Sequence, residues 1–163
     1  MSELRTNRIV PRDGLASGAY GGIIQVKYAN STTVQTIATT TYTDTGLAVT
    51  ITPTRADSAV LLMISLNSNG GGTNRLKLRL IRTVGGSDTS LLGENYLFAQ
   101  HGSGSYFPYD LGGMPMNILD APNTTSQITY HIQFAKHGSS GLLYHLHANH
   151  YGTSSLILME IKG

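Results

Sequence analysis

The sequence predicts an all-β protein, an antiparallel β-sandwich of jelly-roll type. Three stretches alternate apolar and polar residues with period two, which is the pattern of a strand that buries one face. About ten short strand candidates follow one another, separated by turns rich in Gly, Pro, Asn and Asp, as is typical of sandwiches of this type. The 3.6-residue periodicity of an amphipathic helix is not evident in the sequence.

The alternating stretches are the clearest strand signals. An apolar side chain stands at every second position in residues 47–52, 76–81 and 128–135. These apolar side chains therefore share one face of an extended chain. We therefore expect each to turn one face toward the core and the other toward solvent.

Two other segments, 59–66 and 156–161, are almost continuously apolar. Each is too short for a typical buried helix and suits a strand that is covered on both faces. The opposing sheet or another subunit would have to provide that cover.

Shorter signals predict the rest of the sandwich. Further strands are expected at 23–28, 32–36, 91–98, 117–119 and 142–147, and turns at 52–54, 69–72, 85–88 and 137–140. Residues 93–119 are the least regular part, and a long loop in a compact domain usually has a function.

Composition excludes several classes of function. The 163 residues suffice for one domain with a core. With 11 Lys and Arg against 9 Asp and Glu, the formal net charge of +2 is too small to predict nucleic acid or an anionic membrane as a partner. The chain has no cysteine, which excludes disulfides and thiolate metal sites.

The first 22 residues differ from the rest, because arginines and glycines occur there with little periodicity. We expect an N-terminal attachment arm and hinge over 1–22 and a β-sandwich domain over 23–163. The polar N-terminus lacks the apolar stretch of a signal peptide, and the longest apolar run, 59–64, is too short to span a bilayer. We therefore expect neither a signal peptide nor membrane insertion.

Four segments carry a resemblance to a known family. Residues 3–14, ELRTNRIVPRDG, resemble the N-terminal segment of tail-fibre and related structural proteins of phages that infect cyanobacteria. Residues 21–26, 117–130 and 156–161 are similar to segments of the β-domain in those proteins. Each segment is a strand with its turn and not a catalytic signature.

The resemblance implies a homotrimeric virion protein, made in the host cytoplasm and located on the tail or the capsid surface. It also implies attachment to other virion proteins through the arm, by residues Leu4, Arg5, Arg8, Ile9, Val10, Pro11 and Arg12. One interpretation is a tail-fibre or tail-tip component that displays its β-domain for recognition of host polysaccharide. A second is a capsid decoration or cement protein that clamps the head, and a third is a carbohydrate-active depolymerase.

Aromatic residues in the irregular central segment are the candidate receptor contacts. Aromatic faces stack on sugars and bury area at low entropic cost. The candidates are Tyr96, Phe98, His101, Tyr106, Phe107 and Tyr109. Contacts in the core or between subunits are the alternative role for the same residues.

The histidines do not predict a metal site. His145 and His147 would share one face of a strand, and neutral imidazoles are common metal ligands. Without a nearby carboxylate or cysteine, the pair is an incomplete site within one chain. A metal would require several copies of the pair around a threefold axis.

The sequence predicts no enzymatic activity, no catalytic residues and no cofactor. Acidic residues are scattered singly, without the pair of carboxylates that a glycosidase needs. Asp110 and Asp120 are the closest candidates for such a pair, and Asp120 is better interpreted as part of a turn. Residues 102–105 lack the strand-to-helix context of a nucleophile elbow, and 70–73 lack the lysine of a phosphate-binding loop.

Overall fold

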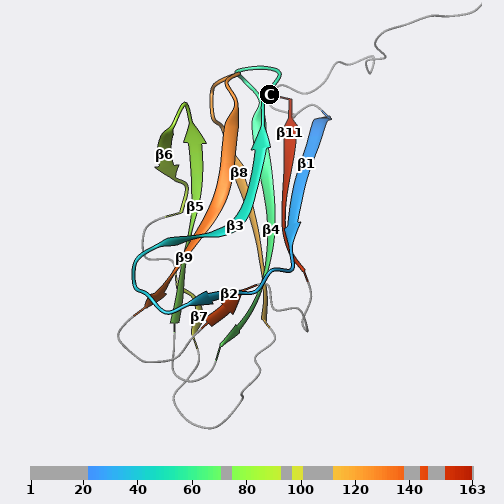
Figure 1. Cartoon of the computed structure of the whole chain (residues 1–163). Helices are drawn as coiled ribbons and strands as arrows, with labels where there is room; N and C mark the ends of the chain where they lie inside the picture. Colours follow the sequence, from blue (N-terminus) through green and yellow to red (C-terminus); the bar gives the residue numbers. More distant parts are fainter. Residues whose placement is uncertain are drawn as a thin grey trace, which may run out of the picture.

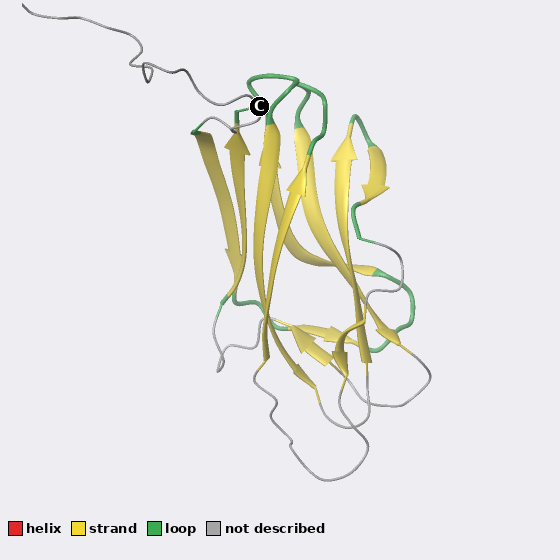
Figure 2. Ribbon diagram, turned by 180° about the vertical axis from the view of Figure 1, so that it is seen from behind, coloured by secondary structure: helices red, strands yellow, loops and turns green. Residues whose placement is uncertain are grey.

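A computed structural model describes residues 22–70, 75–92, 97–100, 112–137, 144–146 and 153–162. These residues form strands and connecting loops and no helix (Figures 1 and 2). The strands are β1 (Ile23–Ser31), β2 (Gln35–Ile37), β3 (Thr43–Ile51), β4 (Ala59–Gly70), β5 (Arg75–Val84), β6 (Ser87–Ser90), β7 (Leu97–Gln100), β8 (Gly112–Asp120), β9 (Ile128–His137), β10 (Tyr144–Leu146) and β11 (Ser154–Ile161).

The strands form two antiparallel sheets that pack face to face. In sheet A the order across the main body is β1-β11-β4-β8, and β10 pairs with the end of β4 and with β2. In sheet B the order is β3-β9-β5-β6, and β7 also pairs with β5. In both sheets a strand from early in the chain pairs with one from late in the chain, β1 with β11 and β3 with β9. This is the arrangement of a jelly roll, so the predicted fold class is confirmed.

The core lies between the sheets and follows from the alternation in the sequence. Leu47, Val49 and Ile51 of β3 are buried, whereas the residues between them are exposed. The same alternation buries Tyr130, Ile132 and Phe134 of β9 against the inward residues of sheet A, such as Leu62 and Leu158. A fully buried side chain of this size stabilises the fold by about 1.5–3 kcal/mol.

The hairpin of β5 and β6 corrects one predicted turn. Only Gly85 and Gly86 form the turn, with φ of 57° and 83°, and Ser87 already belongs to β6. Positive φ at both central residues is the requirement of a type I′ hairpin turn, which glycine meets without strain. β6 was not predicted, because Ser87–Ser90 is polar and exposed throughout.

The central region corrects two further predictions. Of the strand expected over 91–98, residues 91–92 form a bend, 97–98 belong to β7, and 93–96 lie outside the described residues. The strand expected over 117–119 is confirmed as part of β8, but the irregular segment 93–119 contains all but the last residue of this nine-residue strand. Pro115 lies within β8, which an edge strand tolerates because a proline there need not donate to the ladder.

Smaller shifts concern the ends of strands. The strand expected over 32–36 begins only at Gln35, and β4 continues to Gly70, into the turn expected over 69–72. His137 likewise ends β9 instead of opening a turn. The arm, 1–22, lies outside the described residues except for Gly22.

Candidate functional site

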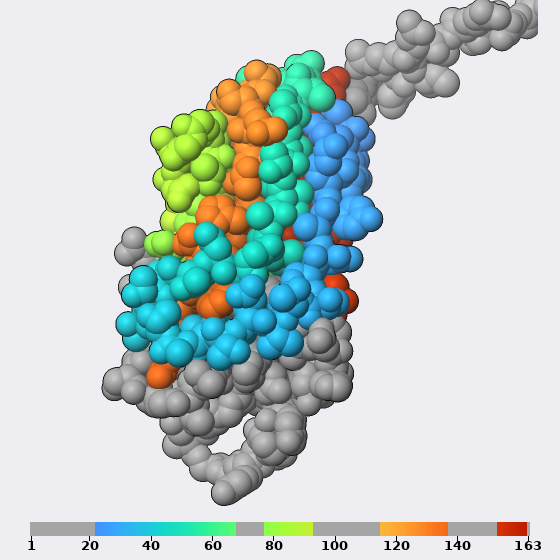
Figure 3. Space-filling model, viewed as in Figure 1, coloured from blue at the N-terminus to red at the C-terminus, as the bar shows by residue number. Residues whose placement is uncertain are grey.

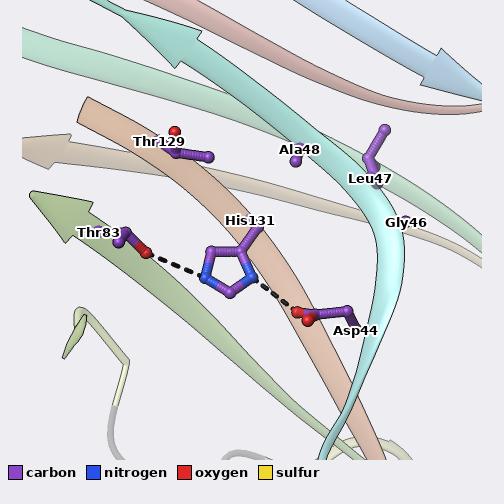
Figure 4. Close-up of a pocket in the computed structure, with 7 residues that line it drawn as sticks. All are labelled: Asp44, Gly46, Leu47, Ala48, Thr83, Thr129 and His131. Carbon is purple, nitrogen blue, oxygen red and sulfur yellow. Dashed lines mark hydrogen bonds and ion pairs between the residues drawn. The ribbon is translucent and has the colours of Figure 1, made fainter. Parts of the chain in front are cut away.

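A hollow of about 420 Å³ opens on the outer face of sheet B, the side that points away from sheet A (Figure 4). It is lined by Asp44, Gly46, Leu47, Ala48, Thr83, Thr129 and His131. These residues come from the three neighbouring strands β3, β9 and β5. The volume lies within the range of small-molecule sites.

The strand β3 is irregular where it borders the hollow. Its register on β9 shifts between Asp44 and Ala48, and Gly46 has a φ of 75°. A side chain at Gly46 would strain the backbone more than it would clash, because the nearest atom to an added Cβ is Nε2 of Gln35 at 3.7 Å. Such a bulge redirects its neighbours, and here the carboxylate of Asp44 lies against His131.

Four polar side chains form a continuous chain of hydrogen bonds beside the hollow. Oδ1 of Asp44 lies 2.7 Å from Nδ1 of His131, and Nε2 of the same ring lies 3.3 Å from Oγ1 of Thr83 (Figure 4). The hydroxyl of Thr83 then donates to Oδ1 of Asp88 at 2.6 Å.

The order Asp–His–Thr resembles a nucleophilic triad, but its protons are placed differently. Thr83 has one hydroxyl proton, and that proton is donated to Asp88. Thr83 therefore has no second proton to donate to Nε2 of His131. An activated nucleophile would donate to the imidazole instead. The arrangement is suited to binding hydroxyl groups, since the side chain of Asp44 is 61% exposed and can accept from a ligand.

The rest of the outer face of sheet B is also polar and hydrogen-bonded. The guanidinium of Arg79 lies 4.3 Å from the ring centroid of Tyr42, and its Nε donates to Oε1 of Gln133 at 2.6 Å. The hydroxyls of Thr50 and Thr129 lie 3.0 Å apart. The strands that form this face cover one side of the molecule in Figure 3, with β1 along one edge.

The outer face of sheet A has the opposite character. The strand register aligns two rows across β1, β11, β4 and β8, with one residue from each strand. The first row is Val26, Met159, Leu61 and Leu119, and the second is Tyr28, Ile157, Met63 and Asn117. We call these two rows the apolar face of sheet A.

The apolar face is exposed in the single chain. Val26 is 49% exposed, Tyr28 is 74% and Leu119 is 50%. The character changes in the next row along the strands, where Asn30, Ser155 and Ser65 are aligned. The apolar surface is therefore confined to the half of the sheet where β1 begins and β11 ends. Contiguous apolar patches of several hundred Å² usually mark interaction sites.

Glu160 is a buried carboxylate with a structural environment. It is 0% exposed and accepts from Nε2 of Gln25 at 2.6 Å and from both the backbone N–H and the hydroxyl of Thr54 at 2.8 Å. Burial is the largest influence and acts to raise the pKa of Glu160, but the hydrogen bonds together outweigh it. The net pKa is lowered. Glu160 thereby fastens β1 and the loop after β3 to β11.

Most of the predicted site residues lie outside the described residues. These are the arm residues Leu4, Arg5, Arg8, Ile9, Val10, Pro11 and Arg12, the aromatic-segment residues Tyr96, His101, Tyr106, Phe107 and Tyr109, and His147. Phe98 lies in β7, beside β5. His145 lies in β10, opposite Thr36 and Asn69. Within the described ranges there is no group of three or more potential metal-ligating side chains.

The contact between Asp44 and His131 was not predicted, because 87 residues separate them and the bulge that joins them has no clear sequence signal. The apolar face has a signal in the continuous apolar segments 59–66 and 156–161. Along these strands, residues that are buried in the core alternate with residues that point outward. The outward residues are the ones that were expected to be covered on a second face of the strand.

Comparison with known proteins does not assign the chain to a family. No protein-family model matches it, and no curated protein matches it. Among solved structures it is similar to the VP2 protein of infectious bursal disease virus in a subviral particle, with a TM-score of 0.48 and 9% identity over 85% of this chain. A viral particle of the same virus gives a TM-score of 0.44 and 10% identity over 97% of this chain.

The chain spans 40% and 41% of the length of those two proteins. Similarity at this level carries no conclusion about function. A helix able to cross a membrane is also absent from the part of the chain that the structure describes.

Proposed function

We propose that this chain is a structural subunit of a phage virion that assembles with copies of itself and with other virion proteins. The observation that carries the proposal is the apolar face of sheet A, which leaves Val26, Tyr28 and Leu119 about half or more exposed in the single chain. A domain that works alone would gain nothing from this surface, whereas a subunit of an assembly buries it.

The N-terminal residues supply the proposed attachment to other virion proteins. Residues 3–14 resemble the N-terminal segment of phage tail-fibre proteins, and they precede β1 directly through the glycines at 14–22. An arm that carries positive charge and little apolar surface becomes ordered against a partner surface, at an entropic cost that the contact area offsets.

The finer proposal is a trimeric tail-fibre or tail-tip component that binds host polysaccharide and acts by binding and not by catalysis. The proton of Thr83 is donated to Asp88, which supports a hydrogen-bonding role for the hollow. The exposed carboxylate of Asp44 is a suitable acceptor for sugar hydroxyls. The aromatic residues at 96–109 are a second candidate contact surface.

Incorporation into virions tests the proposal. A chain that lacks residues 1–14 and a full chain with Arg5, Arg8 and Arg12 all changed to Ala are compared with the control Arg55→Ala, which removes an exposed arginine elsewhere. We expect the first two to fold but to be missing from purified virions, and the control to be incorporated normally. Normal incorporation of the truncated chain would overturn the role of the arm.

Cryo-electron microscopy of intact virions then distinguishes the locations. Density on the tail supports the tail-fibre proposal, whereas density across the capsid lattice would replace it with a decoration protein. A depolymerase would be revealed by turnover of purified host polysaccharide.

A further inference from the structure

The two outer faces of the sandwich are built for different surroundings. Along sheet B, outward residues such as Thr129, His131 and Gln133 are hydrogen-bonded to their neighbours. Along sheet A, seven of the eight outward residues in the two aligned rows are apolar, and the remaining one is Asn117. The outer face of sheet B is therefore suited to contact with water, whereas the outer face of sheet A is suited to burial against another surface.

We propose that the apolar face of sheet A is the interface between copies of this chain, with three copies packed around a threefold axis. This inference rests on the proposed function of a self-assembling subunit and identifies the surface that performs the assembly.

The width of the face fits a threefold arrangement. Four strands spaced about 4.8 Å apart make a face about 19 Å wide. Three such faces closed into a triangular prism would each lie about 5.5 Å from the axis, which is close to half of the ~10 Å spacing between packed sheets. One layer of side chains from each copy therefore fills the interior without leaving a channel.

The apolar rows supply the centre of each contact between copies. The apolar rows, together with Ile161 at their end, extend for about 20 Å along the strands at roughly 6.8 Å for every two residues. A flat area of about 400 Å² per copy gives about 400 Å² for each of the three pairwise contacts, so the apolar rows form the centre of interfaces that extend beyond them.

The chemistry of the face favours a copy of the same chain over a different partner. The two aligned rows contain no charged residue that could select a charged partner. Interfaces of permanent homo-oligomers resemble a domain core in this respect, whereas interfaces with exchanging partners are more polar.

Around a threefold axis, the β1 edge of one copy meets the β8 edge of the next. Val26 would therefore lie near Leu119 of the neighbouring copy, since the two residues end the same row on opposite edges of the sheet. This contact between different edges distinguishes a closed ring of three from a symmetric pair.

A matched pair of valines provides the first test. Val26 is 49% exposed on the apolar face, and Val34 is 43% exposed in the loop before β2. By sedimentation velocity at micromolar concentration, we expect the unchanged chain and Val34→Lys to be trimers and Val26→Lys to be a monomer. Circular dichroism confirms that the variants are folded. A trimeric Val26→Lys, or an unchanged chain that is a monomer or dimer, would overturn the proposal.

Charge pairing across the corner provides the second test. Leu119→Glu alone should also give a monomer, whereas the double variant Val26→Lys with Leu119→Glu should recover the trimer by placing opposite charges at each corner. Failure of the folded double variant to recover any trimer would contradict the predicted neighbours.

The absence of cysteine allows a third, independent measurement on the full chain. Met63→Cys lies on β4, one of the two central strands of the face, and should be cross-linked between copies by a short bismaleimide, whereas Val34→Cys should not. Cross-linking of Val34→Cys alone would place the interface elsewhere. These measurements use purified protein, so a failed interface is distinguishable from a failure to enter virions.

Discussion

The hydroxyl of Tyr130 donates to Oδ2 of Asp120 at 2.7 Å and so connects the two sheets of the sandwich. Tyr130 lies on β9 of sheet B, and Asp120 ends β8 of sheet A. Nη1 of Arg82, also in sheet B, donates to both carboxylate oxygens at 2.8 and 3.0 Å. Burial, and then the hydrogen bond to Asp120, raise the pKa of Tyr130, so the phenol stays protonated and continues to donate.

The first prediction concerns this connection. Tyr130→Phe should lower the free energy of unfolding by about 1 kcal/mol, because Asp120 keeps its bond to Arg82. Asp120→Ala should lower it by about 3 kcal/mol, because it leaves both Tyr130 and the largely buried Arg82 without their partner. Urea unfolding at one fixed protein concentration measures both values.

The control for that series is Asp57, which forms an exposed pair with Arg55 at 2.7 Å. Asp57→Ala should leave the urea midpoint nearly unchanged. Equal losses of unfolding free energy for Asp57→Ala and Asp120→Ala would show that the contact between the sheets contributes no more than an exposed ion pair.

The second prediction separates folding from assembly with two adjacent leucines of β4. Leu62 is fully buried in the core, whereas Leu61 points outward on the apolar face. Leu62→Ala should cost about 3 kcal/mol of folding stability. Leu61→Ala should leave the stability of the monomer almost unchanged and, by weakening the trimer, reduce the dependence of the melting temperature on protein concentration. Similar concentration dependence in the two variants would contradict this division.

The sequence predicted the strands that bury apolar residues far better than those that do not. Alternation identified β3, β5 and β9 because their inward residues are apolar and their outward residues polar. β6 has only polar, exposed residues and lacks the usual signal. In β8 only 117–119 was predicted, because two glycines and a proline occupy its first half. Both sequences can form strands because the strands lie at the edges of their sheets. Which strands lie at an edge depends on the tertiary fold, so the sequence pattern alone does not reveal it.

The site was less predictable than the fold. Asp44 and His131 meet because a bulge at Gly46 shifts the register of β3 on β9, and single-sequence patterns do not determine register. The apolar face was partly foreseen from β4 and β11. Its extension to Val26 and Leu119 depends on which strands lie at the two edges.

The third prediction tests the bulge. Gly46→Ala should cost about 1–2 kcal/mol, because an alanine is strained at a φ of 75° although space is available. Gly46→Asn should cost less, since asparagine tolerates this conformation. Gly22→Ala, where an added Cβ meets nothing within 4 Å, is the control and should be neutral. Unfolding in urea measures all three, and an Ala variant at position 46 as stable as the control would contradict the backbone argument.

The last prediction follows from the lowered pKa of Glu160. A carboxylate whose pKa is lower in the folded chain stabilises the fold fully above its ordinary pKa of 4.5, and this contribution disappears as the pH falls through the folded value. Glu160→Gln should therefore lose about 1–3 kcal/mol at pH 7, and the difference from the unchanged chain should shrink below pH 4.5. Thr54→Val, which removes one donor to the carboxylate, should move the acid transition of the chain to higher pH. Urea unfolding between about pH 3 and 7 measures these curves, and a constant difference across that range would show that Glu160 does not titrate with folding.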